Sequence, residues 1–81
     1  MRYSYPAIID KNGDLFDITF PDIQGAFTCC TYEEEILRHA KEVLKLHIIS
    51  KTDKLAPSEL EDLQEKYPNS KIIQVEVFID E

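Results

Sequence analysis

The chain has 81 residues, a formal net charge of −7 and a sequence pI near 4.7. A chain of this length predicts one domain over residues 1–81, with a small core that association with a second copy would help to stabilise. The negative charge argues against direct binding to nucleic acid, which needs a basic face, and no apolar run approaches the roughly 20 residues that span a membrane.

The first thirty residues predict an antiparallel meander of three strands. Residues 2–10 alternate between apolar and polar side chains, and residues 15–20 do the same after an Asn-Gly turn in which Gly13 supplies the positive φ. Residues 21–25 carry proline, aspartate and glycine and predict a turn, and residues 26–29 predict a short third strand.

One long amphipathic helix is expected after this meander, ending near Ile49. Thr31 and Glu34 have the spacing of a capping box, in which the Thr31 hydroxyl and the Glu34 carboxylate satisfy amides of the first turn. Apolar residues then recur at helical spacing and predict a face that packs on a sheet. This stripe comprises Ile36, Leu37, Ala40, Val43, Leu44, His47 and Ile48.

The last third of the chain predicts a short helix and a fourth strand. Residues 50–55 are a polar connection, and Ser58 with Glu61 forms a second capping box. Residues 71–79 alternate as a strand. If the long helix brings the chain back to the other end of the sheet, this strand runs parallel to the first strand through a right-handed crossover. The expected fold is α+β, β-β-β-α-(α)-β, with a single mixed sheet of order 3-2-1-4 and the long helix on one face.

Association into a dimer or higher homo-oligomer is expected from this arrangement. Strands three and four are sheet edges, and Ile8 and Phe78 fall on the face away from the long helix. Pairing of edges or packing of faces would cover these groups.

Several motifs resemble the N-terminal domain of the HicB antitoxins. They are the Tyr-Pro-Ala-Ile-Ile run of residues 5–9, the Asn-Gly-Asp of residues 12–14 and the Thr-Phe-Pro-Asp-Ile-Gln-Gly-Ala-Phe-Thr of residues 19–28. Tyr-Glu-Glu at residues 32–34 and Ala-Lys-Glu-Val-Leu at residues 40–44 continue the similarity, which covers about residues 3–49.

Two differences from the family pattern lie at the start of the helix. Cys29 and Cys30 stand where the family has a glycine and a small polar residue, and about one extra residue lies between Thr31 and Ala40. No basic arm or helix-turn-helix pattern follows Ile79, so regulation by direct DNA binding is not expected.

The resemblance implies a partial ribonuclease-H-like layer and the function of an antitoxin. Such a protein sequesters and masks a small basic HicA-type mRNA ribonuclease, and is not itself an enzyme. The resemblance directs attention to the proline-containing turn, and the acidic start of the helix suits a basic partner. The residues expected to contact the toxin are Pro21, Asp22, Gln24, Phe27, Glu33 and Glu34.

No catalytic set, metal site or cofactor site is visible in the sequence. Asp10, Asp17 and Glu34 could suggest a metal-dependent nuclease, but they fall on a polar face, at turns and at a helix cap rather than converging. His47 lies on the apolar stripe and is interpreted as a packing residue rather than a ligand. Cys29 and Cys30 are interpreted as small hydrophobic residues at a strand end rather than as nucleophiles.

An alternative function remains open from sequence: a stand-alone oligomeric HicB-like protein with no toxin, serving a structural or regulatory role. Adjacent cysteines rarely form a disulfide, because the geometry is strained. With no other cysteine in the chain and no signal peptide at its start, a cytoplasmic location is expected.

Overall fold

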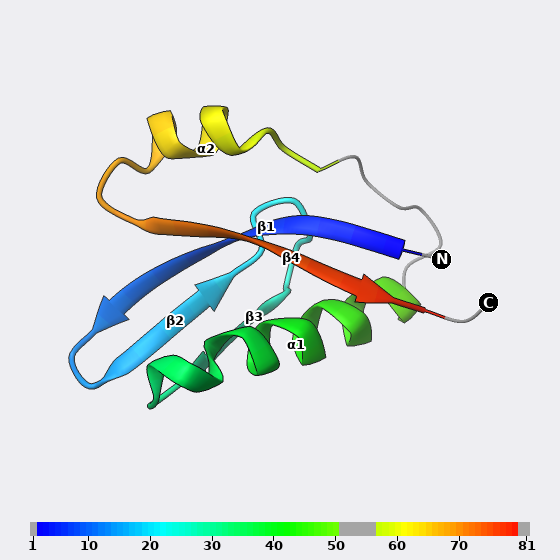
Figure 1. Cartoon of the computed structure of the whole chain (residues 1–81), viewed down its shortest axis with the longest axis horizontal. Helices are drawn as coiled ribbons and strands as arrows, with labels where there is room; N and C mark the ends of the chain where they lie inside the picture. The colour runs from blue at the N-terminus through cyan, green and yellow to red at the C-terminus, as the bar shows by residue number, and fades with distance from the viewer. Residues whose placement is uncertain (1, 51–56, 80–81) are drawn as a thin grey trace.

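A computed structural model describes residues 2–50 and 57–79. Their four strands form one sheet in the order β3-β2-β1-β4, which confirms the predicted α+β class and strand order (Figure 1). The strands are β1 (Arg2–Asn12), β2 (Leu15–Thr19), β3 (Phe27–Cys30) and β4 (Lys71–Phe78). The helices are the 3₁₀ turn η1 (Glu33–Glu35), α1 (Ile36–Ser50) and α2 (Leu60–Lys66).

The predicted parallel pairing of the first and last strands is wrong. β4 runs antiparallel to β1, with Tyr3 opposite Val77 and Ile9 opposite Lys71, so the whole sheet is antiparallel. The prediction assumed that the long helix is the one element that reverses the chain direction between the third and the fourth strand. In the structure α2 runs back along the other face of the sheet, and this further reversal changes the direction in which β4 starts (Figure 1).

The two helices cover opposite faces of the sheet (Figure 1). The face under α1 holds the main core, in which Ile18, Leu44 and Val75 are fully buried. On the opposite face α2 packs on β4 and buries Leu63, and Ile8 is only 5% exposed. The expectation that Ile8 would be an exposed apolar residue is therefore wrong, because it assumed that this face had no helix. Phe78 is exposed, as expected.

Neither predicted capping box forms. The 3₁₀ turn that precedes α1 has Tyr32 as its N-cap and no side-chain cap, and α2 has Glu59 as its N-cap, again without a side-chain cap. Glu33 to Glu35 instead occupy the 3₁₀ turn, where their charge is still favoured by the helix dipole. Every fourth residue of the α1 stripe is buried as expected, namely Ile36, Ala40, Leu44 and Ile48. Leu37 is the one member of the stripe that is largely exposed.

Candidate functional site

The turn between β2 and β3 is held by its own backbone and by Asp22. The Ile23 amide donates to the Phe20 carbonyl at 3.2 Å, and the Ala26 amide donates to the Ile23 carbonyl at 3.1 Å. Gly25 has φ of 85°, a left-handed conformation that favours glycine. Ile23 is buried, so the turn is anchored to the core rather than standing free.

Asp22 connects this turn to the start of α2. Its carboxylate accepts a hydrogen bond from the Ser58 amide at 2.9 Å and a second one from the Ser58 hydroxyl. Burial raises the pKa of the Tyr5 hydroxyl above its usual value, and the negative charge of Asp22 raises that pKa further. Asp22 was expected to contact a toxin, yet the structure gives it an internal partner 36 residues away.

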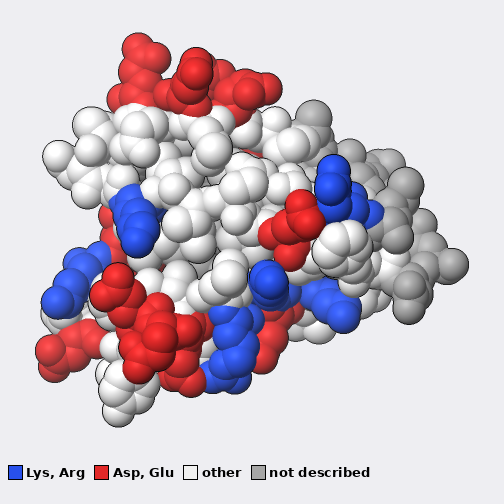
Figure 2. All heavy atoms as spheres, viewed as in Figure 1, with Lys and Arg blue, Asp and Glu red and all other residues white. Residues whose placement is uncertain are grey.

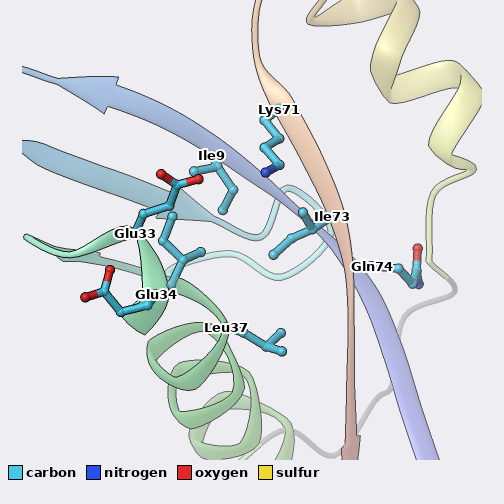
Figure 3. A pocket seen from close by; sticks show the side chains of 8 residues that line it. Ile9, Glu33, Glu34, Leu37, Lys71, Ile73 and Gln74 are labelled. Carbon is cyan, nitrogen blue, oxygen red and sulfur yellow. The ribbon is translucent and has the colours of Figure 1, made fainter.

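Glu33 and Glu34 lie at the other end of β3, where α1 begins. Both side chains are exposed, and they line a hollow of about 380 Å³ between α1 and β4 (Figure 3). Leu37 and Ile73 point toward one another across this hollow, and Lys71 reaches into the same gap. The hollow thus combines an apolar floor with carboxylates at its margin.

The six residues expected to contact a toxin do not form one cluster. Pro21 and Gln24 are exposed in the turn, and Phe27 is 69% exposed on β3. Glu33 and Glu34 lie beyond the far end of that strand, beside β4, which is the opposite edge of the sheet from β3. The sequence placed the turn and the acidic helix start next to each other, but a complete strand separates them.

Sequence reasoning missed the surface along β4. A second hollow, of about 390 Å³, lies between α1 and the end of β4 and is lined by Lys41, Glu42, Lys45, Glu76, Val77 and Phe78. A third, of about 570 Å³, lies between α2 and Gln74, with Glu59, Glu61 and Asp62 among its lining residues. The signal was present in the predicted strand order, since order 3-2-1-4 already made this strand an edge.

The two cysteines differ in environment. Cys30 is buried and its thiol donates to the Tyr32 carbonyl at 3.5 Å, whereas Cys29 is exposed. Burial raises the pKa of the Cys30 thiol, and Glu35 and Cys29 raise that pKa further, against an opposing effect of Arg38. Cys30 therefore packs as a small hydrophobic residue, as predicted, whereas Cys29 is exposed and the same prediction does not hold for it.

Residues 2–50 and 57–79 contain neither a metal-binding cluster nor a membrane-spanning helix. No group of three or more histidine, cysteine or acidic side chains in this part of the chain could hold a metal ion. Asp10 and Asp17 face each other across β1 and β2, and the Ser70 hydroxyl donates to Asp10. His47 is half-buried and its Nδ1 lies 2.9 Å from the Val43 carbonyl oxygen. No helix in the described segments has the length and apolar character needed to cross a membrane.

The architecture is a four-stranded antiparallel sheet with one helix on each face, in a small chain with a net charge of −7. The sequence profile described as "HicB_like antitoxin of bacterial toxin-antitoxin system" matches residues 5–81, and the chain belongs to this family.

Solved structures agree with this assignment. A chain from a structure of the HicA3 and HicB3 toxin-antitoxin complex is 27% identical, with a TM-score of 0.69 over 98% of this chain and 100% of that one. The N-terminal domain of Burkholderia pseudomallei antitoxin HicB is 18% identical, with a TM-score of 0.72 and the same coverage, and shows the shared fold. A search of curated proteins finds no match.

Proposed function

We propose that this chain is an antitoxin that binds a HicA-type toxin and masks its mRNA ribonuclease activity. The supporting observation is the likeness, along nearly its whole length, to a chain from the HicA3 and HicB3 complex, together with membership of the HicB-like antitoxin family. The net charge of −7 suits capture of a basic protein, because opposite charges steer association.

Neutralisation proceeds by binding and requires no chemistry from this chain. The hollow between α1 and β4 combines apolar side chains with the carboxylates of Glu33 and Glu34, and the hollow on the α2 side adds further carboxylates. Apolar groups surrounded by polar ones are typical of protein interfaces. The toxin's own catalytic group is covered when the two proteins associate, so inhibition is stoichiometric.

Co-expression tests this function directly. The chain is produced together with a HicA-type toxin, and RNA cleavage by that toxin is measured with and without the chain. We expect a one-to-one complex in which cleavage is abolished. Unchanged cleavage in the presence of excess chain would overturn the antitoxin function and favour a stand-alone HicB-like protein.

Reversing charge at the start of α1 is expected to slow toxin capture. The double variant Glu33→Lys, Glu34→Lys keeps the fold, because both side chains are exposed and neither caps the helix. Exposed interfacial charges act mainly on the association rate, so we expect a decrease of about tenfold at low salt that shrinks as salt is added. Stopped-flow measurement of association over a salt series gives this rate.

A control with the same change in charge separates position from net charge. Glu61 and Asp62 line another hollow beside β4, so they do not serve as a remote control. The double variant Asp14→Lys, Asp17→Lys does serve, since Asp14 lies in the turn between β1 and β2 and Asp17 lies on β2, which is not a neighbour of β4. An equal slowing by the two double variants would show that only net charge matters.

Self-association is proposed as well. β3 is a sheet edge with Phe27 exposed beside it, and Phe78 is exposed on β4. We expect a dimer of the free chain at high micromolar concentration in sedimentation equilibrium. A monomeric mass under those conditions would contradict this expectation.

A further inference from the structure

The open edge of β4 carries a surface that the proposed antitoxin function does not by itself explain. β4 is eight residues long, twice the length of the opposite edge strand β3, and α1 and α2 stand on either side of it (Figure 1). An edge strand offers backbone donors and acceptors to any extended chain that lies beside it. This edge therefore presents a row of backbone donors and acceptors between the two helices.

The register shows which backbone groups face outward. The Phe20 amide donates to the Ala26 carbonyl at 3.0 Å, and hydrogen-bonded pairs alternate along antiparallel strands. Because the Phe20 N–H points to β3, the N–H and C=O groups of Thr19 point to β1, where Thr19 pairs with Ile8. Even-numbered residues of β1 therefore bond to β2, and odd-numbered ones such as Tyr5 bond to β4. Tyr5 pairs with Val75, so the odd-numbered residues of β4 bond to β1. The residues whose N–H and C=O groups point to the open edge are Ile72, Gln74, Glu76 and Phe78.

Side-chain hollows lie on both faces of the same edge. The two hollows between β4 and α1 contain apolar groups, namely Leu37 with Ile73 in one and Val77 with Phe78 in the other. The hollow on the α2 face is lined by the carboxylates of Glu59, Glu61 and Asp62, and among the described residues no lysine or arginine lines it. Figure 2 shows a mostly uncharged surface between the carboxylates of α2 and the mixed charges of α1, with separate charged side chains at both of its ends.

We infer that β4 receives an extended segment of the partner protein as a fifth strand. Side chains of a strand alternate between faces, so the segment would place apolar residues toward α1 and basic residues toward α2. The backbone bonds supply affinity, and the alternation of apolar and basic residues supplies specificity. This inference rests on the proposed function, since the segment is assigned to the same basic toxin.

Residue-resolved amide hydrogen exchange by NMR tests the inference in the complex of this chain with a HicA-type toxin. In the free chain the amides of Ile73, Val75 and Val77 are protected by β1, while those of Ile72, Gln74 and Glu76 exchange rapidly. We expect the second set to slow at least tenfold in the complex. On β3, the amides of Phe27 and Cys29 remain unchanged.

Other outcomes have distinct meanings. A complex in which the even-numbered amides of β4 still exchange rapidly overturns strand addition but leaves the antitoxin function intact. Protection confined to β3 assigns the partner to the opposite edge. Protection of β4 in the free chain that grows with concentration identifies a second copy as the occupant. Absence of any complex refutes the proposed function itself.

A pair of variants tests the hollows independently of exchange. Leu37 is 47% exposed and lines the hollow beside β4, whereas Leu46 is 67% exposed on another side of α1 and lines a hollow with Thr28 of β3. Leu37→Asp is expected to weaken toxin affinity about tenfold or more, as loss of an interface anchor does. Leu46→Asp is expected to leave affinity unchanged, and equal loss in the two variants would contradict the placement.

Discussion

Leu44→Asp is expected to unfold the domain. Leu44 is fully buried at the centre of α1, beneath which the sheet offers only apolar side chains. An unpaired carboxylate there costs several kcal/mol, against a total stability of about 5 kcal/mol or somewhat more for a domain of this size. The variant should lack a cooperative thermal transition by circular dichroism at room temperature and above.

The same substitution two residues further on gives the matched control. Leu46 is 67% exposed, so Leu46→Asp should melt within a few degrees of the parent. Ile36 is the first residue of the buried stripe, and Ile36→Asp should also unfold the domain. Cooperative melting of Leu44→Asp near the parent midpoint would mean that α1 does not pack through this face.

Asp22→Ala is the second change with a large expected effect. It removes the acceptor of two hydrogen bonds from Ser58 and leaves the start of α2 without its attachment to the β2–β3 turn. Hydrogen bonds to a charged group are worth roughly 1.5–3 kcal/mol each, and partial exposure of Asp22 places the expected loss near the lower value. Urea denaturation measures the loss, which should appear mainly as a lower midpoint.

The double-mutant cycle with Ser58→Ala isolates this contact. Because the two residues share one interaction, the double variant Asp22→Ala, Ser58→Ala should be about as stable as the less stable single variant, with a coupling energy of roughly 0.5–3 kcal/mol. Asp10→Ala is a useful comparison, since its carboxylate accepts from a different serine, Ser70, at an exposed site. Additive losses for Asp22 and Ser58 would show that the carboxylate does not hold α2 in solution.

Local patterns predicted the elements of this fold well because each was strongly periodic. The alternation in β1 and β4 and the stripe of α1 were read from spacing alone. The strand order was also correct, although it was reached by placing the last strand parallel to the first through a right-handed crossover. The direction of β4 was not predictable in the same way. It depends on whether α2 runs back along the sheet before β4 begins. In the structure α2 is held there by burial of Leu63 and by the hydrogen bonds of Ser58 to Asp22, which lies 36 residues earlier in the chain.

The same limit applied to the candidate site. Asp22 was assigned to a partner from the turn motif, but whether a carboxylate is free or occupied is decided by tertiary contacts. Ser58 looked like a helix cap for the same reason, and its hydroxyl bonds to that carboxylate instead. Glu33 and Glu34 were correctly read as exposed, yet their neighbour is β4 rather than the turn.

The pairing of the first strand with the last has a consequence for synthesis on the ribosome. β1 is made first and lies inside the sheet, but one of its two neighbours, β4, is the last strand to emerge. Until residue 78 has left the exit tunnel, one side of β1 has no partner and Val75 cannot complete the core. Long-range pairing of this kind also slows folding, because loop closure precedes the stabilising contacts. The β4 edge of the sheet therefore forms only after residues 71–78 have been synthesised.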